Sequence, residues 1–364
     1  MKWGSKVKRT ACIFYASTFV VLSLATVAAA QTTPAELIDM SLEDLLDLDI
    51  SESDVKTKKK HWEFNLSYTK GSFGGYKSGT TEFSFQDVLF SQGEMRSDQN
   101  YPIVPTFICQ NAFNASASYH ISDRTSLSVS VPYITQSTDH ISSVPGFQEF
   151  ILKTEGIGDI AVALAHGKKL SNNDNLTSVI GVRLPVGSIN ETGDTPRNGP
   201  NTLERLPYTM QLGSGTLDLT GSLTYLRNDK DFSLGANVNG VLRTGKNDNH
   251  YRLGNNIGTS VFARYNKHHQ FQPGIRLSAR HIGRISGGDI SLETAGPFPF
   301  PASITDPSNY GGEKVSATAT VRSCVKSDCL LSFSAEYSKP IYQNLNGIQP
   351  MERNSFSLGT ALKF

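Results

Sequence analysis

The sequence has few charged residues and no long hydrophobic run beyond its N-terminus. Only 18% of the 364 residues are Asp, Glu, Lys or Arg, whereas charged residues make up about a quarter of a typical soluble domain. A transmembrane helix needs about 20 consecutive apolar residues, and no such stretch follows residue 30. Lys and Arg (34) balance Asp and Glu (33), which excludes the basic surface of a nucleic-acid-binding protein. The 19 Phe and 13 Tyr residues exclude a disordered chain.

Recognisable catalytic and metal-binding motifs are also lacking. The eight histidines are scattered along the chain, and there is no H-E-x-x-H, no P-loop and no G-x-S-x-G motif. A phospholipase built on a membrane barrel would need a serine and a histidine converging on one lipid-facing edge, and no pattern indicates this. We therefore expect no enzymatic activity, no cofactor and no metal site.

Cysteine is scarce, with four residues in the whole chain. Cys324 and Cys329 flank a predicted tight turn, which places them near opposing positions on two antiparallel strands. The sequence therefore predicts a local disulfide between them in an oxidising compartment. A zinc site would need two further ligands nearby, and these are missing. We interpret Cys109 as a small strand residue.

The first 30 residues have the pattern of a secretory signal peptide. A basic segment containing Lys2 and Arg9 precedes an apolar stretch over 11–27, and three alanines then precede Gln31. The alternative is a membrane anchor, but the apolar stretch is short and ends in small residues typical of a cleavage site. We therefore expect the chain to be exported.

From residue 62 to the C-terminus, apolar and polar residues alternate with a period of two. Segments about ten residues long show this pattern, for example 62–69, 217–225 and 257–265, which predicts strands with one apolar face. Short polar turns alternate with long loops rich in Gly and Pro, such as 71–105 and 285–311. A transmembrane β-barrel has this organisation. An exported β-sandwich would normally carry many Lys and Glu on its polar face, whereas this chain carries mainly Ser, Gly, Asn and Thr there.

Counting hairpins back from the C-terminus predicts about 12 antiparallel strands. Eleven follow residue 107, and 62–70 supplies the twelfth. The segment 81–90 also alternates but would give an odd number, so we assign it to an extension within the first external loop, because bacterial single-chain barrels have even strand numbers. The last strand ends on Phe364, which resembles the assembly signal of bacterial outer-membrane proteins.

The predicted organisation is therefore a signal peptide (1–30), a periplasmic helix and linker (31–60) and an all-β, transmembrane antiparallel barrel (61–364). We expect it in the outer membrane of a Gram-negative bacterium, in contact with outer-membrane lipid and delivered by the barrel assembly machinery.

Three glycine-rich motifs point to a known family. They are Gly-Ile-Gly-Asp at 156–159, Leu-Pro-Val-Gly at 184–187, and Gly-Ser-Gly at 213–215 followed by Asp218. Over about 110–364 the chain resembles the meta-pathway phenol-degradation transporter family. The resemblance implies an outer-membrane barrel that passes small aromatic compounds, and it carries over no substrate-binding residues. A shorter likeness at residues 40–46 is to the segment after the signal peptide in outer-membrane receptors, but no plug domain accompanies it.

With the apolar face outward, the opposite face places charged residues in the lumen. The predicted solute pathway includes Arg183, Arg243, Arg252, Arg264, Arg276, Arg280, Arg322, Asp159, Asp218 and Glu336. Inward charge in a pore selects ions and polar solutes. The alternative is that the arginines pair with the carboxylates and merely hold the lumen together. Arginines outside such pairs would favour anionic or aromatic-carboxylate solutes.

One short helix is predicted before the barrel. Ser41 is a typical N-cap, and the gate candidates that follow it are Leu42, Glu43, Asp44, Leu45 and Leu46. So short a helix is marginal in water and needs a surface to dock on. We expect residues 36–50 to dock in or under the periplasmic mouth; the alternative is a flexible tether.

These features predict a channel for passive passage of small solutes, hydrophobic or aromatic in character. Twelve strands enclose a lumen wider than that of a filled eight-stranded barrel and narrower than that of a 16-stranded porin. Two alternatives remain: a secretion channel of the amyloid-exporting type, for an extended polypeptide and with the N-terminal helix as a plug, and a structural or adhesive barrel.

Overall fold

The computed structural model describes residues 62–91, 93–197 and 201–364. The predicted signal peptide and the predicted helix with its gate candidates lie outside this range. The long strands of the wall and the shorter elements attached to them are β1 (Trp62–Gly79), β2 (Thr81–Phe83), α2 (Phe85–Val88), β3 (Ile103–Ser122), β4 (Thr125–Ser142), β5 (Glu149–Ile157), β6 (Ile160–Lys169), β7 (Asp174–Leu184), β8 (Thr192–Asp194), β9 (Leu203–Arg205), η1 (Tyr208–Met210), β10 (Asp218–Asn228), β11 (Phe232–Arg243), β12 (Tyr251–Arg252), β13 (Asn256–Tyr265), β14 (Gln272–Ile282), β15 (Ser286–Gly287), η2 (Ile290–Leu292), η3 (Ser303–Thr305), β16 (Gly312–Cys324) and β17 (Leu331–Lys363).

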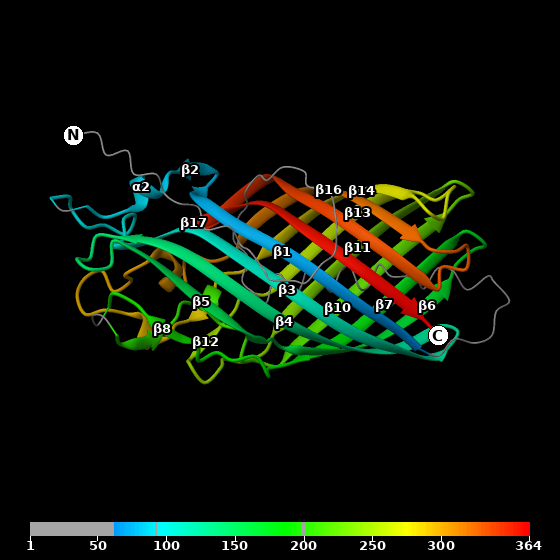
Figure 1. Cartoon of the computed structure of the whole chain (residues 1–364). Helices are drawn as coiled ribbons and strands as arrows, with labels where there is room; N and C mark the ends of the chain where they lie inside the picture. The colour runs from blue at the N-terminus through cyan, green and yellow to red at the C-terminus, as the bar shows by residue number, and fades with distance from the viewer. Residues whose placement is uncertain (1–61, 92, 198–200) are drawn as a thin grey trace.

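Within the described part of the chain, eleven of these strands form a closed antiparallel barrel, as predicted (Figure 1). Their order around the wall is β1, β3, β4, β6, β7, β10, β11, β13, β14, β16 and β17, and β17 pairs back with β1. The strand β17 crosses the wall twice. It pairs with β16 from Ser332 to Leu345 and with β1 from Leu345 to Lys363, and the chain reverses near Gly347, whose φ is 65°. The described residues therefore contribute twelve barrel-spanning segments to the wall.

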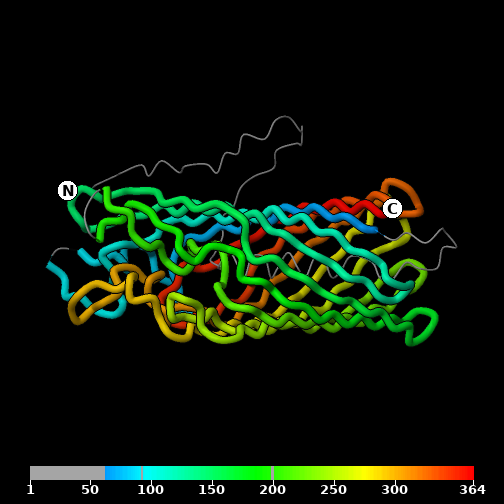
Figure 2. The backbone as a smooth tube through the Cα atoms, turned by 90° about the horizontal axis from the view of Figure 1, so that it is seen from below, coloured from blue at the N-terminus to red at the C-terminus, as the bar shows by residue number. Residues whose placement is uncertain are grey.

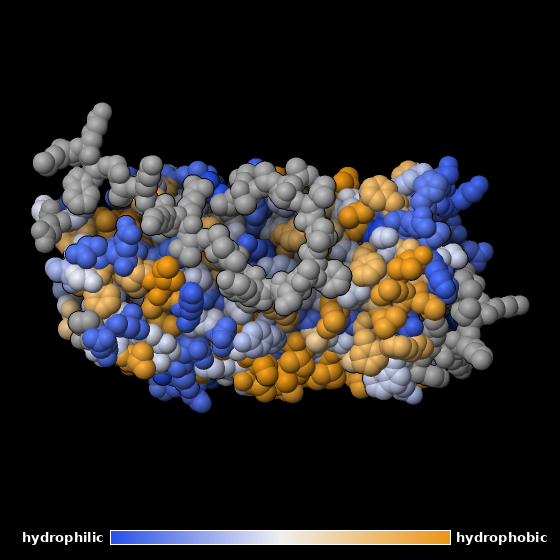
Figure 3. Space-filling model, in the orientation of Figure 1, coloured by the Kyte–Doolittle hydropathy of each residue, from blue (hydrophilic) through white to orange (hydrophobic). Residues whose placement is uncertain are grey.

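The period of two in the sequence separates an apolar outer face from a polar inner face. Leu219, Leu223 and Ile257 are 44%, 47% and 53% exposed, whereas the inward Asn65 and Ser130 are buried. Figure 3 shows apolar side chains gathered over the barrel wall. A closed sheet with this polarity satisfies its backbone hydrogen bonds internally and exposes apolar groups to lipid.

The two ends of the barrel differ in the length of their connections. Short turns, such as the two residues between β3 and β4, lie at the end that carries the C-terminus, and long loops gather at the other end (Figures 1 and 2). We call these the periplasmic and the external end. Several strands extend into the predicted external loops: β1 continues to Gly79, β3 begins at Ile103 and β4 continues to Ser142.

Two external regions differ from the predicted loops. Residues 344–352 are extended within β17 and contain the reversal, instead of forming a long loop. Residues 81–90 include β2, which pairs with β1, and the short helix α2, and so form the predicted extension. Among the described residues, no helix is both long enough and apolar enough to cross a lipid bilayer.

The strands β5 and β6 together form one long strand with a break. Both strands pair antiparallel with β4. The β5 pairing begins where Tyr133 faces Ile157 and continues toward the external end, and the β6 pairing begins where Ser130 faces Ala161 and continues toward the periplasmic end. Gly158 and Asp159 occupy the break between them. At this break the Asp159 side chain contacts the segments that follow β7 and precede β10, through Gly187 and Ser214.

Candidate functional site

Two cavities with different linings lie in the described part of the lumen. The first lies against β1, β3, β4, β6, β7, β10, β11 and β13 and is lined mainly by hydroxyl, amide and small side chains, including Asn65, Ser116, Ser130, Ser222 and Asn239. Among its lining residues Arg183 is the single charged one. Hydroxyl and amide groups both donate and accept hydrogen bonds, so this part of the lumen suits water and neutral polar groups.

The second cavity lies against β14, β16 and β17 and is strongly charged. Arg276, Arg280 and Lys314 line it together with Glu336. The guanidinium of Arg276 makes two contacts with the Glu336 carboxylate, at 3.2 and 3.4 Å, and Lys314 forms a salt bridge with Glu352. The rest of the lining consists of hydroxyl residues, namely Ser278, Ser316, Thr318, Ser338, Ser355 and Ser357.

A buried ion pair joins β10 and β11 at the external end of the first cavity. Asp218 and Arg243 face each other in register and form a salt bridge, and both are almost completely buried. The Thr216 hydroxyl also donates to the Asp218 carboxylate, at 2.7 Å. Arg183 lies opposite Asp218 on the other side, on β7. This arrangement supports the pairing alternative for Arg243, as the Glu336 contacts do for Arg276.

Asp159 joins the three glycine-rich motifs into one structural unit. Its Oδ1 accepts a hydrogen bond from the Gly187 N–H at 3.0 Å, and its Oδ2 accepts bonds from the N–H and the hydroxyl of Ser214, both at 2.8 Å. The backbones of Gly187 and Gly213 lie in direct contact. A side chain at position 213 would not fit, because its Cβ would lie 2.4 Å from the Gly187 carbonyl oxygen. We call this unit the Asp159 junction. It fixes both ends of the loop 188–212.

Described residues of that loop pack against the inner face of the barrel wall at the external end. The side chains of Leu206 and Met210 are fully buried and pack against Leu152 of β5. The carbonyl of Thr209 in η1 accepts a hydrogen bond at 3.5 Å from Gln110, a buried residue of β3. The loop 188–212 therefore contacts β3 and β5, which both pair with β4, and we call it the external plug.

A cluster of tyrosines holds the external plug against the neighbouring loops. The Tyr208 ring makes edge contacts with Tyr251 and Tyr310, at centroid distances of 4.7 and 5.6 Å. The Tyr208 hydroxyl accepts a hydrogen bond from the Asp289 N–H at 3.0 Å, and the Tyr310 hydroxyl donates to the Ile304 carbonyl at 2.7 Å. Burial raises the pKa of Tyr208 to about 12 and raises that of Tyr251 as well, so both phenols stay neutral at physiological pH.

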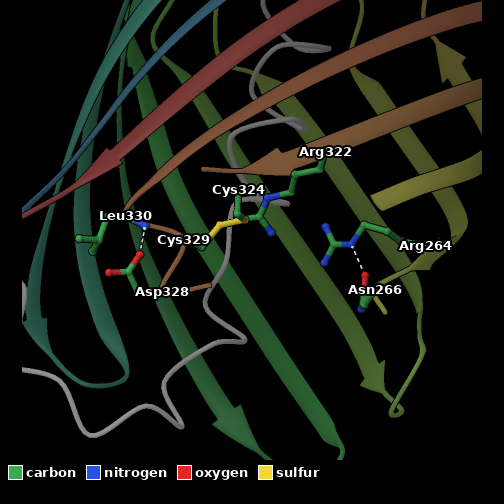
Figure 4. The surroundings of a disulfide bond; sticks show 7 residues. All are labelled: Arg264, Asn266, Arg322, Cys324, Asp328, Cys329 and Leu330. Atoms are coloured by element: carbon green, nitrogen blue, oxygen red, sulfur yellow. Dashed lines mark hydrogen bonds between the residues drawn. A yellow bond between two sulfur atoms is a disulfide. The ribbon is translucent and has the colours of Figure 1, made fainter. Parts of the chain in front are cut away.

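The periplasmic end carries a disulfide at one of its turns. Cys324 and Cys329 are bonded across the turn between β16 and β17, with their Cα atoms 4.8 Å apart, and both are buried. The Arg322 guanidinium donates a hydrogen bond to the Cys329 sulfur at 3.4 Å. The Arg264 guanidinium donates to the side-chain oxygen of Asn266 at 3.0 Å. Figure 4 shows Arg322 against the disulfide and Arg264 reaching toward the same region.

Most of the predicted lumen residues face inward on the strands. On barrel strands lie Arg183 (β7), Asp218 (β10), Arg243 (β11), Arg264 (β13), Arg276 and Arg280 (β14), Arg322 (β16) and Glu336 (β17). Two differ from the prediction in position. Asp159 occupies the break between β5 and β6, and Arg252 lies in β12, which pairs with β15 among the external loops and not in the wall.

The sequence pattern missed Lys314, which lines the second cavity, its salt-bridge partner Glu352, and the whole external plug. Lys314 and Glu352 fell outside the predicted strands, because β16 and β17 extend beyond the predicted strand ends. For the external plug a signal did exist: Leu206, Tyr208, Met210 and Leu212 alternate within a predicted loop, and all four are buried. Among the described residues, no group of His, Cys, Asp and Glu is arranged to hold a metal ion.

No family model and no curated protein sequence matches the chain. Among solved structures, its fold is similar to that of an outer-membrane channel from Pseudomonas putida F1, with a TM-score of 0.54 at 12% identity over 87% of this chain and 100% of the other. A mutant of the TodX monoaromatic hydrocarbon channel and a FadL homologue from Pseudomonas aeruginosa give TM-scores of 0.44 and 0.39 at 8% and 12% identity, each over 84% of this chain and 91% of the other. These two values are too low to carry an inference. The chain has the fold of an outer-membrane β-barrel.

Proposed function

We propose that the protein is an outer-membrane channel through which small solutes, hydrophobic or aromatic in character, diffuse passively. The observation that carries this proposal is the separation of two surfaces by the closed sheet. Apolar side chains face outward along the strands, while hydroxyl, amide and charged side chains line internal cavities. Such a barrel fits lipid on its outside and water or solute on its inside.

The size of the solute is limited by the barrel and by its external end. Twelve crossings enclose a lumen narrower than that of a 16-stranded porin. The external plug narrows it further, because Leu206 and Met210 pack against the wall. Only small solutes fit such a path, and the external plug has to move aside for them.

Two features support an aromatic solute. Hydroxyl and amide groups in the first cavity of the lumen can bind the polar substituent of a guest such as phenol. The three motifs that resemble the phenol-degradation transporter family also meet at the Asp159 junction, beside the external plug.

Uptake measurements test this function. A deletion strain would be compared with the same strain carrying the intact gene, using labelled phenol, toluene and glucose at low external concentration. We expect the gene to raise phenol and toluene uptake several-fold and to leave glucose uptake unchanged. Equal uptake of all three solutes with and without the gene would contradict the proposal, provided that heat-modifiable migration of the protein confirms a folded barrel.

We also propose that residues 36–50 narrow the periplasmic mouth. Glu43 and Asp44 are acidic, and the periplasmic part of the lumen carries Arg264 and Arg322. Opposite charges attract more strongly in the reduced dielectric of a pore than in bulk water.

Deleting residues 34–55 tests this gate. In planar bilayers we expect the truncated protein to show a higher single-channel conductance or open probability than the full chain. The variant Glu43→Gln/Asp44→Asn keeps the length of the segment and should give an intermediate effect. An unchanged trace from a correctly folded truncated barrel would mean that the segment is a tether.

A further inference from the structure

We infer that the inner faces of β1 and β3 form a binding site for uncharged hydroxyl compounds, so that the channel prefers solutes with a hydroxyl group, whether aromatic or aliphatic. This inference rests on the proposed channel function and names a class of solute within it. The site lies in the first cavity, whose lining includes Asn65 and Ser116. Its four residues are Asn65 and Ser67 of β1 and Asn114 and Ser116 of β3, and we call it the β1–β3 site.

The strand register gathers these four side chains in one patch of the lumen. Asn65 lies opposite Ser116, and Ser67 lies opposite Asn114. Opposed residues leave the same face of a sheet, as do residues two apart on one strand, so all four side chains face inward. Opposed Cβ atoms are about 5 Å apart, and residues two apart on a strand are about 7 Å apart. One small molecule can therefore reach groups on both strands.

Each of the four residues has a buried polar atom that lacks a hydrogen-bond partner among the described residues. These atoms are Asn65 Oδ1, Ser67 Oγ, Asn114 Nδ2 and Ser116 Oγ. On the β10–β11 side, by contrast, the Asn237 amide donates to the hydroxyls of Ser222 and Thr224, at 2.9 and 2.7 Å. Buried polar groups are nearly always hydrogen-bonded, so the β1–β3 site needs partners from water or from a solute.

The unpartnered atoms of the β1–β3 site include both donors and acceptors. Asn65 Oδ1 only accepts, and Asn114 Nδ2 only donates, because Asn114 Oδ1 already accepts from the Ser130 hydroxyl at 2.6 Å. The hydroxyls of Ser67 and Ser116 can do either. A solute hydroxyl both donates and accepts, as water does, so it can replace water at these groups. A carboxylate or an ether only accepts, an ammonium group only donates, and a hydrocarbon does neither.

The same side of the lumen leads to the external plug. Gln110 lies four residues before Asn114 on β3 and donates to the carbonyl of Thr209 in the external plug. Gln110 Oε1 and the Thr209 hydroxyl are buried, and within the described part of the chain neither has a hydrogen-bond partner. A hydroxyl compound that passes the external plug therefore meets groups of the same kind before it reaches the β1–β3 site.

Current block in planar bilayers tests the site with two pairs of solutes that differ in one group. Phenol is compared with anisole, and cyclohexanol with cyclohexanone, because the ether and the ketone only accept hydrogen bonds. We expect each alcohol to halve the potassium chloride current at about tenfold lower concentration than its counterpart, the factor expected when one buried polar group would otherwise stay unpaired.

Three variants connect this preference to the β1–β3 site. Asn65→Ala/Ser116→Ala removes two of the unpartnered groups and should abolish the preference for alcohols. The matched variant Asn237→Ala/Ser222→Ala removes the same residue types from the β10–β11 side, where they bond each other, and should keep the preference. Asn65→Ser shortens the side chain but retains an acceptor, so it should keep most of the preference, which a merely structural role of Asn65 does not predict. Heat-modifiable migration verifies that each variant is a folded barrel.

The outcomes separate the site from the channel. Block by the ether and the ketone as readily as by the alcohols, a preference confined to the aromatic pair, or a preference that survives Asn65→Ala/Ser116→Ala would overturn the inference and leave the channel. If the intact protein passes no current, the channel proposal fails, and equilibrium binding of phenol and anisole to the purified protein in detergent then tests the site by itself. Equal affinity for the two, corrected for uptake into protein-free micelles, would overturn it, as would absence of binding.

Discussion

The external and periplasmic ends of the barrel are stabilised by different kinds of interaction. The external end contains buried apolar clusters, a buried ion pair and the Asp159 junction. The periplasmic end has short turns with exposed pairs, such as Arg227 with Asp229, and one disulfide. Buried apolar side chains contribute about 1.5–3 kcal/mol each, whereas exposed ion pairs contribute under about 1 kcal/mol. Most of the side-chain stabilisation outside the wall is therefore concentrated at the external end.

The largest expected effect comes from breaking the buried ion pair at the external end. Asp218→Ala leaves the guanidinium of Arg243, which is 2% exposed, without its carboxylate. We expect the free energy of unfolding in urea to fall by about 3–5 kcal/mol. The matched change Asp229→Ala removes a carboxylate 3.6 Å from Arg227 at an exposed periplasmic turn and should cost under about 1 kcal/mol. Equal losses for the two variants would remove the contrast between the ends.

A smaller effect is expected from the Asp159 junction. Asp159→Ala removes the acceptor for the N–H groups of Gly187 and Ser214 and should cost about 2–3 kcal/mol. Because the junction fixes both ends of the external plug, we also expect a higher open probability in planar bilayers. Asp174→Ala is the control, since Asp174 likewise accepts bonds from Ser171 and Tyr225 but lies near a periplasmic turn. A destabilised Asp159 variant with unchanged gating would separate the junction from the external plug.

The wall was predictable from the sequence because lipid and lumen impose a period of two on every strand. Leu219, Leu223 and Tyr225 alternate with Thr220, Ser222 and Thr224 in the sequence, and their exposure alternates in the structure. Strand ends were less predictable. Outside the bilayer both faces meet water or other loops, so the alternation is lost while the pairing continues, as in the external parts of β4 and β17.

The site was only partly predictable, because its external part depends on contacts between residues far apart in the sequence. The Tyr208 hydroxyl accepts a hydrogen bond from the backbone of Asp289, 81 residues away, and Gln110 donates to the backbone of Thr209, 99 residues away. No local pattern encodes such contacts. The alternation predicted the inward positions of Arg276, Arg280 and Glu336. It missed Lys314 and Glu352, because both lie where the strands extend beyond the alternating segments.

Acid should weaken the external end through His140. This residue lies on the external extension of β4, stacked on Phe150 at a centroid distance of 4.6 Å. Burial lowers the pKa of His140 to about 3, while an unfolded histidine titrates near 6.5. The unfolded chain therefore binds a proton that the folded chain excludes, and stability falls as the pH drops below about 6.5. At pH 5 the expected loss is about 2 kcal/mol relative to neutral pH.

The variant His140→Phe retains an aromatic ring and removes the titrating group, so the difference in unfolding free energy between pH 7 and pH 5 should shrink by about that amount. His166→Phe, at an exposed position of β6 near the periplasmic end, controls for the loss of an imidazole as such. If His140→Phe leaves the pH dependence of the intact protein unchanged, His140 is not the group that makes the external end sensitive to acid.

The smallest effect is expected from the disulfide at the periplasmic end. The bond between Cys324 and Cys329 closes a turn of only four intervening residues, so it removes little conformational entropy from the unfolded chain. Replacing both cysteines by serine should lower the free energy of unfolding by no more than about 2 kcal/mol and leave conductance unchanged, because the turn is also held by strand pairing up to Cys324–Ser332. Intact-mass analysis without reductant verifies that the bond is present in the starting protein. A loss as large as that of Asp218→Ala would show that the periplasmic turns carry as much stabilisation as the external closure.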